Sequence, residues 1–197
     1  MILPRKFYAR STVTVARDLL GKVIRHGAAA ARIVEVEAYL GEHDPAAHSS
    51  RGLTPRTRVI FGSPGHAYVY LIYGMYECLN IVAEPRGIAG CVLIRAVEPL
   101  RGIALATNGP GKLTRALGIT REHYGADLVR GPLTVHDDGV GRNFDIGVSR
   151  RIGITHAADL PLRFYVAGNR YVSRSPASKL SASPTAHDQD LARDIVR

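Results

Sequence analysis

Two glutamates that stand two residues apart are the first side chains in this sequence whose types and spacing suggest chemistry. Glu35 and Glu37 lie in the segment 32–40, where apolar residues alternate with polar ones at the two-residue period of a strand. Alternate strand residues point to one face and lie about 7 Å apart, so both carboxylates share a face with Tyr39. Such a pair can activate a water molecule, and it is also typical of a solvated sheet face. The pair alone leaves both interpretations open.

A loop rich in Gly, Pro, Ser and His follows the carboxylates at residues 41–65. Loops of this length in compact domains are often functional. His43, Asp44 and His48 lie within it and add candidates for orienting a water or holding a metal. Their spacing matches no strong metal-ligand signature, so we predict no metal site. The Thr-Pro pair that opens residues 54–61 predicts a short helix there.

Tyrosines are concentrated in the next segment, at positions 68, 70, 73 and 76. The segments 67–73 and 76–83 are predicted strands, joined at Gly74 and Met75 in the manner of a hairpin. Aromatic residues at this spacing are more often core than a surface on which bases stack. Tyr73 at the turn is costly to leave in water without a partner, however. In a basic chain this favours a stacking platform and a wedge into a nucleic-acid duplex.

Two basic residues, Arg95 and Lys112, lie in sequence contexts that suggest a function. Arg95 lies within the apolar run 91–97, where an arginine is seldom buried without an anionic or hydrogen-bonding partner. It either reaches solvent from a strand edge or pairs with a carboxylate, for which Glu37 is the obvious candidate. The Gly-Pro-Gly sequence at 109–111 opens a predicted helix whose free N–H groups can hold a phosphate, with Lys112 adding charge. The glycine spacing is not that of a P-loop.

The remaining elements position these residues. A helix is predicted from Thr14, as its N-cap, to Leu20, with Gly21 at its end. Further strands are predicted at 22–25, 32–40 and 91–97 and, as several short strands, between 128 and 166. Strands with few short helices predict one α+β domain, residues 1–173, around a curved, mainly antiparallel sheet. Ser, Ala and Pro dominate residues 174–197, for which we predict a mobile tail.

Composition limits the classes of function. The chain has 197 residues, 46% of them hydrophobic, which is enough for a sizeable core. Its net charge of +9 favours a polyanionic partner without requiring one. No window approaches the roughly 18 to 20 apolar residues of a membrane span, and residues 1–10 are unlike a signal peptide, so we expect a cytoplasmic location. Cys78 and Cys91 lie in apolar runs and are predicted to be reduced and buried.

Taken in chain order, these segments resemble the alkyladenine (3-methyladenine) DNA glycosylase family. The resemblance spans about residues 4–173 and is carried by 16–23 (ARDLLGKV), 32–41 (RIVEVEAYLG), 46–49 (AAHS), 68–80 (YVYLIYGMYECLN), 90–100 (GCVLIRAVEPL), 109–117 (GPGKLTRAL), 151–153 and 162–166. The ordered agreement of so many segments is far more specific than any one of them.

The resemblance implies a fold like the C-terminal domain of formyltransferases and an activity in base-excision repair. The family flips alkylated or deaminated purines such as 3-methyladenine, 7-methylguanine, ethenoadenine and hypoxanthine out of damaged duplex DNA and hydrolyses the N-glycosidic bond. An abasic site is left. The resemblance further implies a monofunctional enzyme without metal or cofactor. We expect a monomer, located in the cytoplasm, or in the nucleus if the source is eukaryotic.

The resemblance also assigns the chemistry and the base pocket residue by residue. Glu37 is implied to be the general base, and Arg95 to help hold the water. The flipped base is implied to stack between Tyr39 on one side and Tyr70 with His48 on the other.

Specificity and DNA contacts follow from the same match. Asn80 is implied to line the pocket and to disfavour normal guanine by crowding its amino group, and Ala46 belongs to the same pocket. Tyr73 is implied to fill the gap that the flipped nucleotide leaves, with Met75 and Lys112 as further DNA contacts. The sequence departs from the family pattern at 59–63, 84–88 and in the tail, which puts its lesion preference in doubt.

Two other functions remain open at this point. One is a nucleic-acid-binding protein of the same fold that has lost catalysis. The other is a metal-dependent nuclease built on Glu35, Glu37 and His48. Excision of a damaged base without metal separates the glycosylase from both.

Overall fold

The computed structural model describes residues 1–140 and 143–173, and the predicted tail at 174–197 lies outside the described residues. The strands are β1 (Val23–His26), β2 (Ala29–Tyr39), β3 (Ala67–Ile72), β4 (Tyr76–Val82), β5 (Cys91–Arg101), β6 (Leu133–His136), β7 (Ile146–Ser149) and β8 (Arg163–Val166). The helices are α1 (Arg5–Tyr8), α2 (Thr12–Leu19) and α3 (Pro110–Leu117), with 3-10 turns η1 (Gly41–His43), η2 (His48–Arg51) and η3 (Arg121–His123).

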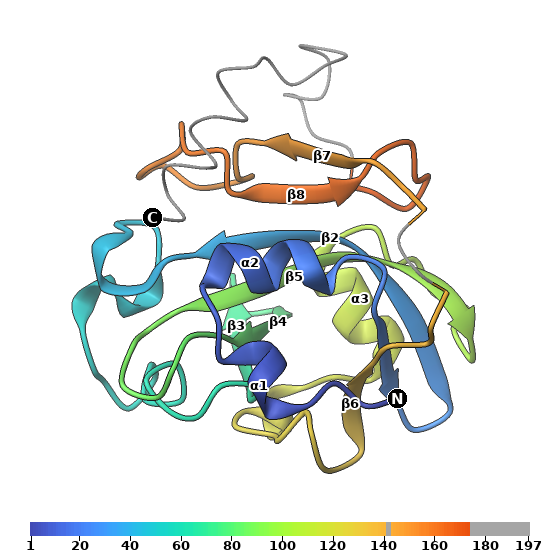
Figure 1. Cartoon of the computed structure of the whole chain (residues 1–197), viewed down its shortest axis with the longest axis horizontal. Helices are drawn as coiled ribbons and strands as arrows, with labels where there is room; N and C mark the ends of the chain where they lie inside the picture. Colours follow the sequence, from blue (N-terminus) through green and yellow to red (C-terminus); the bar gives the residue numbers. More distant parts are fainter. Residues whose placement is uncertain (141–142, 174–197) are drawn as a thin grey trace.

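The eight strands form one sheet in the order β3-β4-β5-β2-β1-β6, and β8 pairs with both β2 and β7. Every strand pair among the described residues is antiparallel. The predicted α+β class and the curved antiparallel sheet are confirmed (Figure 1). The likeness to formyltransferase domains stays a prediction.

Strand β2 is the centre of the fold. One of its edges pairs with β5, and its other edge pairs first with β1 and then with β8. Figure 1 shows β7 and β8 lying along β2 on the side away from the rest of the sheet. Because both edges are covered, nearly every residue from Ala30 to Ala38 is buried. The strand starts earlier than predicted, since Ala29 already pairs with His26 across a tight turn at Gly27 and Ala28.

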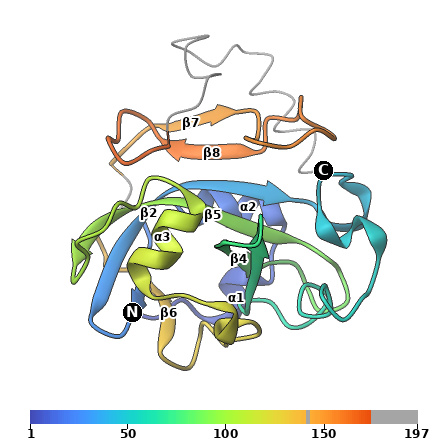
Figure 2. The ribbon, with the colours of Figure 1, turned by 180° about the vertical axis from the view of Figure 1, so that it is seen from behind.

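The two helices of eight residues pack on the sheet beside β2. Helix α2 lies against β2 and β5, and α3 lies against β4 and β5 (Figure 2). Val34, Val36 and Ala38 of β2 face the main apolar core, so the alternate residues Glu35 and Glu37 face away from it. The predicted cap of α2 is wrong: Ser11 is the N-cap, and its hydroxyl accepts a hydrogen bond from the N–H of Thr14.

The short helix predicted at 54–61 is also wrong, because the segment forms successive turns instead. The hydroxyl of Thr57 donates to the carbonyl of Gly52 and accepts from the N–H of Thr54. Ile60 and Gly62 then bond to carbonyls only three residues back. Threonine side chains that bond to nearby backbone groups compete with helix formation, and β-branched residues disfavour it further.

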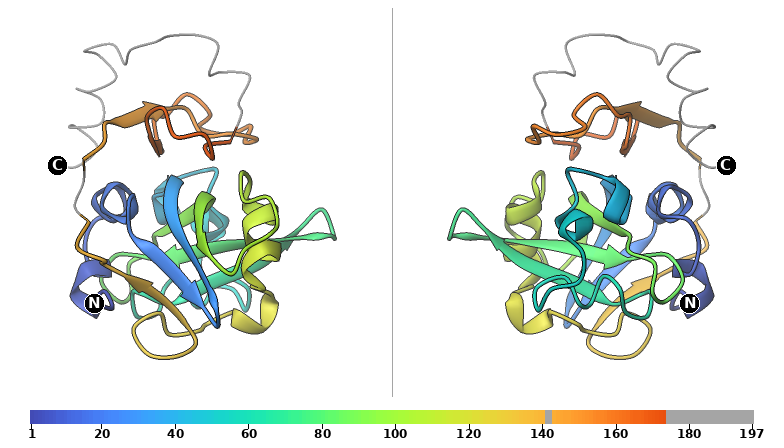
Figure 3. Two further views of the ribbon diagram at one scale, coloured as in Figure 1. Left: turned by 90° about the vertical axis from the view of Figure 1, so that its right-hand side faces the viewer. Right: turned by 90° about the vertical axis from the view of Figure 1, so that its left-hand side faces the viewer.

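The predicted hairpin is present and projects from the body of the molecule as β3 and β4 (Figure 3). Its loop has three residues, because Ile72 pairs with Tyr76. Tyr73 and Gly74 both adopt positive φ, at 52° and 70°. Such a backbone suits glycine and is unusual for tyrosine. The fold therefore holds an aromatic side chain at the tip in a conformation that few residues other than glycine adopt.

Candidate active site

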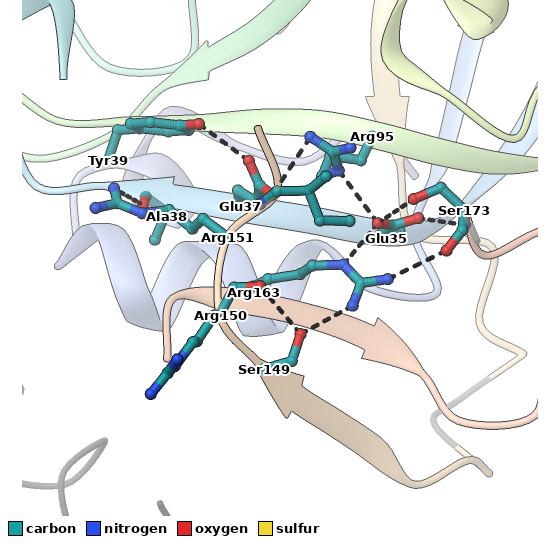
Figure 4. A network of polar contacts seen from close by, with 11 residues as sticks. Glu35, Glu37, Ala38, Tyr39, Arg95, Ser149, Arg150, Arg151, Arg163 and Ser173 are labelled. Carbon is teal, nitrogen blue, oxygen red and sulfur yellow. Dashed lines mark hydrogen bonds and ion pairs between the residues drawn. The ribbon is translucent and has the colours of Figure 1, made fainter. Parts of the chain in front are cut away.

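Glu35 and Glu37 are fully buried, so the interpretation as a solvated sheet face is wrong. Their predicted common face with Tyr39 is confirmed by contacts, because the Tyr39 hydroxyl donates to Glu37 Oε2 at 3.0 Å. Arg95 of β5 lies between the carboxylates, with Nε 3.2 Å from Glu35 Oε1 and Nη1 3.3 Å from Glu37 Oε1. Arg95 is thus buried and paired with both carboxylates, not with Glu37 alone (Figure 4).

Glu37 has one further donor, from a distant part of the chain. The backbone N–H of Ile152 donates to Glu37 Oε1 at 2.7 Å. Burial raises the pKa of Glu37 above its ordinary value, although Arg95, the Ile152 N–H and Tyr39 oppose this effect. A carboxylate with a raised pKa is a better proton acceptor near neutral pH than a free glutamate.

Besides Arg95, Glu35 has hydrogen-bond donors in Arg163 and Ser173. Its Oε1 accepts from Arg163 Nε at 2.7 Å and from the Ser173 hydroxyl at 2.6 Å, and its Oε2 accepts from the Ser173 N–H at 2.6 Å. Arg163 also donates to the Ser149 hydroxyl at 2.8 Å, so this network ties β2, β5, β7 and β8 together (Figure 4). The arrangement is that of a fold-stabilising ion cluster.

A cavity of about 210 Å³ lies beside Glu37. Glu37 itself does not line it, but its three donors Tyr39, Arg95 and Ile152 do. The lining includes all the residues predicted for base binding, together with several others: Tyr39, Ala46, His48, Tyr68, Tyr70, Ile72, Cys78, Asn80, Cys91, Leu93, Arg95, Pro110, Ile152, Gly153 and Ile154. The predicted pocket residues are therefore gathered around one space that adjoins the buried carboxylate.

Aromatic residues make up much of the cavity lining. The His48 ring lies edge-on to Tyr70, with centroids 4.6 Å apart, and Tyr70 lies 5.4 Å from Tyr68. Tyr39 also lines the cavity, and the Arg151 guanidinium lies 4.7 Å from the centre of its ring. Arg151 is held in turn by Asp44, and both side chains are inaccessible to solvent. Asp44, predicted as a candidate for orienting a water or holding a metal, thus holds Arg151 against the Tyr39 ring.

The side-chain amide among the cavity-lining residues is that of Asn80, on β4. Its Nδ2 donates to the carbonyl of Tyr68 at 3.2 Å, and the Cys91 Sγ lies 3.9 Å from its Oδ1. The amide is therefore oriented by its neighbours before any ligand arrives. Both cysteines are free and buried, as predicted.

The residues predicted to contact DNA lie outside the cavity. Tyr73 and Met75 are 78% and 67% exposed at the hairpin tip. Lys112 is exposed in the first turn of α3, where its Nζ lies 3.2 Å from Asn108 Oδ1. Because Pro110 lines the cavity, this helix start lies at its rim.

Comparison with known proteins agrees with this geometry. The model of the methylpurine-DNA glycosylase (MPG) family matches residues 6–170. The chain belongs to this family. A relative from Methanoculleus marisnigri is 51% identical over 192 residues, covering 88% of this chain and all of the relative. Relatives from Legionella pneumophila (strain Lens), 48% identical, and Alkaliphilus oremlandii, 46% identical, also cover 88% of this chain and 98% and 100% of their own lengths. All three carry the name "Putative 3-methyladenine DNA glycosylase".

The structure adds site residues to those that family resemblance singled out. Ile152, Gly153 and Ile154 line the cavity, and Ile152 also binds Glu37. The matched segment 151–153 was the only sequence signal for them, and it came without a role. Arg151 was not predicted as a site residue, and Tyr68 was predicted only as part of the stacking platform.

The described residues hold no group of three or more His, Cys, Asp or Glu that could bind a metal. Glu35 and Glu37 are both engaged by Arg95, and His48 bonds to Tyr68, so the alternative nuclease trio does not assemble. Among residues 1–140 and 143–173, no helix is long and apolar enough to cross a membrane.

Proposed function

We propose that the protein is a monofunctional DNA glycosylase that flips alkylated or deaminated purines from duplex DNA into the cavity and hydrolyses the N-glycosidic bond. The observation that carries the proposal is Glu37: a fully buried carboxylate whose donors Tyr39, Arg95 and Ile152 line an aromatic cavity. Family membership supports the same class of reaction.

Binding depends on the aromatic residues that line the cavity. Tyr39 on one side and Tyr70 with His48 on the other sandwich the flipped base, and Ala46 and Asn80 complete the pocket. An alkylated purine such as 3-methyladenine carries positive charge, which electron-rich tyrosine rings attract. Asn80, held by Tyr68, crowds the amino group of normal guanine and so selects against it.

Hydrolysis depends on Glu37 and Arg95. Glu37 accepts a proton from a water whose oxygen forms the new bond to C1′ of the deoxyribose, and Arg95 helps hold that water. The electron pair of the N-glycosidic bond leaves with the base, which departs uncharged when it was cationic at the start. The reaction forms no Schiff base and uses no metal or cofactor. Neutral lesions such as hypoxanthine and ethenoadenine need a proton on the base as well.

Flipping depends on the hairpin. Tyr73 at its tip enters the minor groove and occupies the space that the flipped nucleotide leaves, beside Met75. Lys112 and the start of α3 hold a phosphate at the cavity rim. The protein acts as a monomer.

The test is an excision assay in buffer with EDTA, on duplexes that carry 3-methyladenine, 1,N6-ethenoadenine or hypoxanthine, with an undamaged duplex as control. We expect abasic sites, revealed by alkali cleavage, in lesion duplexes only. Loss of activity in EDTA, or strand cleavage without an abasic intermediate, contradicts the proposal.

A further inference from the structure

Three side chains, His48, Tyr68 and Arg56, form a hydrogen-bonded chain that begins in the lining of the cavity. Nδ1 of His48 lies 2.8 Å from the Tyr68 hydroxyl oxygen. Nε of Arg56 lies 3.2 Å from the same oxygen. His48 lies in η2, Tyr68 in β3 and Arg56 in the turns between them, so three separate segments contribute.

The hydrogen-bonding capacities of Arg56, Tyr68 and His48 limit which of their atoms can donate. Arg56 can only donate, so Tyr68 accepts the hydrogen of Arg56 Nε. The hydroxyl has one hydrogen of its own, and His48 Nδ1 is the acceptor that the described residues offer it. The arrangement that uses this hydrogen has the lone pair on Nδ1, which places the ring hydrogen of a neutral His48 on Nε2. No described residue pairs with that Nε2, and the ring lines the cavity.

The charge of His48 is set by the groups around it. Burial, followed by the positive charges of Arg56 and Arg51, lowers the pKa of His48 to about 4. Tyr68 and Tyr70 are the titratable groups that face the ring from β3, and burial raises the pKa of both hydroxyls, so both are neutral. The hydroxyl of Tyr68 further favours neutral His48, because it donates to the lone pair that protonation removes.

We infer that Tyr68 and Arg56 are positioning residues that hold His48 neutral with its hydrogen on Nε2, so that it donates to an acceptor atom of the flipped nucleotide without repelling a cationic base. The inference rests on the proposed function. It explains how the same pocket accepts both charged and neutral lesions, because a neutral His48 repels neither. A protonated imidazole in contact with cationic 3-methyladenine would weaken binding of that lesion and leave neutral ethenoadenine unaffected.

The first test observes His48 directly, without DNA. Nitrogen-15 correlation spectra of the histidine rings report the tautomer and its titration, with the His48 signals assigned from a His48→Gln variant. We expect unprotonated Nδ1 and protonated Nε2 down to about pH 5. In Tyr68→Phe we expect mixed tautomers and a titration closer to the ordinary histidine range. Protonated Nδ1 in the wild type, or the same tautomer and titration in Tyr68→Phe, overturns the inference.

The second test uses the charge of the lesion. Single-turnover excision of 3-methyladenine and ethenoadenine is compared at pH 8 and pH 6. In Tyr68→Phe the ratio of the 3-methyladenine rate to the ethenoadenine rate, divided by the wild-type ratio at the same pH, should fall at pH 6 by up to about fourfold. Fourfold is the limit for a histidine at its ordinary pKa of about 6.5, and burial and the two arginines still lower the pKa of His48 in this variant. Protonation of Glu37 lowers both rates together and cancels in this ratio. Ethenoadenine alone needs a proton on the base, so the wild-type ratio itself varies with pH and serves as the reference at each pH.

The matched control is Tyr8→Phe, since the Tyr8 hydroxyl is buried, has no partner and lies outside the cavity. Its ratio should match the wild type at both pH values. A Tyr68→Phe ratio equal to the wild-type ratio at both pH values refutes the positioning role while leaving the glycosylase proposal intact. If the wild type excises neither lesion, the proposed function fails instead, and the spectra still decide the tautomer.

Discussion

The two carboxylates of β2 share one arginine, yet they belong to different regions. Glu35 lies in an ion cluster with Arg95, Arg163 and Ser173, which joins β2 to the later strands. Glu37 lies beside the cavity, and each of its donors also lines it. A carboxylate surrounded by cations holds the fold together, whereas one next to a space for a ligand can act on that ligand.

The two carboxylates also differ in the number of positive charges that lie next to them. Glu35 faces the two guanidiniums of Arg95 and Arg163. Among the described residues, Arg95 is the single cationic partner of Glu37, and burial raises the pKa of Glu37. Burying a charge without full compensation costs stability, and such costs are found where function requires them. The difference predicts that variants of Glu35 lose stability and variants of Glu37 lose chemistry.

The largest stability effect is expected from Glu35→Gln. The change leaves Arg163 buried without a countercharge and should lower the free energy of unfolding by about 3–5 kcal/mol, the cost of breaking one side of a buried ion pair. Urea denaturation monitored by circular dichroism measures it. Glu37→Gln is the matched control and should stay within about 1 kcal/mol of the wild type, because ionised Glu37 is itself destabilising. Equal losses of stability in Glu35→Gln and Glu37→Gln would contradict the proposed difference between the surroundings of the two carboxylates.

The pH dependence of excision should be set by Glu37. Only its ionised form accepts a proton, so the rate on 3-methyladenine, which needs no proton on the base, should fall about tenfold per pH unit below the raised pKa. Because the folded state binds this proton more tightly than the unfolded state, the Glu37 contribution to stability increases as pH falls through the folded pKa. Excision should therefore decline while circular dichroism still shows a folded protein. A rate that falls only together with the fold contradicts this assignment.

A smaller effect is expected at the hairpin tip. Tyr73 is 78% exposed, so Tyr73→Ser should leave stability unchanged. Loss of a ring that fills the vacated stack should weaken lesion binding roughly tenfold, near the low end of the ~1–3 kcal/mol of a base–aromatic contact. Fluorescence anisotropy with lesion duplexes measures it, and Tyr73→Phe, which keeps the ring, is the control. Unchanged affinity in Tyr73→Ser would show that the tip does not enter the duplex.

Much of the site could be predicted because its residues lie in local sequence patterns. The two-residue period of 32–40 placed Glu35, Glu37 and Tyr39 on one face, and the tyrosine-rich segment predicted the hairpin that bears Tyr73. The turn at Gly74 follows from the conformational freedom of glycine. These features depend on residues close together in the chain.

The different surroundings of the two glutamates could not be predicted in this way. Their deciding partners, Ile152 for Glu37 and Arg163 and Ser173 for Glu35, come from more than 110 residues away. Only the paths of β8 and of the segments on either side of it bring these groups to β2. Periodicity cannot separate two side chains on the same face. The wrong helix at 54–61 has a similar cause, since the Thr57 hydroxyl bonds to the backbone instead of leaving it to a helical turn.

The central claim is that Glu37 performs chemistry and does not hold the fold, and Glu37→Gln tests it most directly. The measurement compares lesion-duplex affinity and single-turnover excision for this variant and the wild type, without metal. The account predicts that affinity is retained while excision falls by roughly 10²–10⁴-fold, the contribution of a general base, because glutamine keeps the shape and cannot accept the proton. Equal loss of affinity and excision, or undiminished excision, would contradict it.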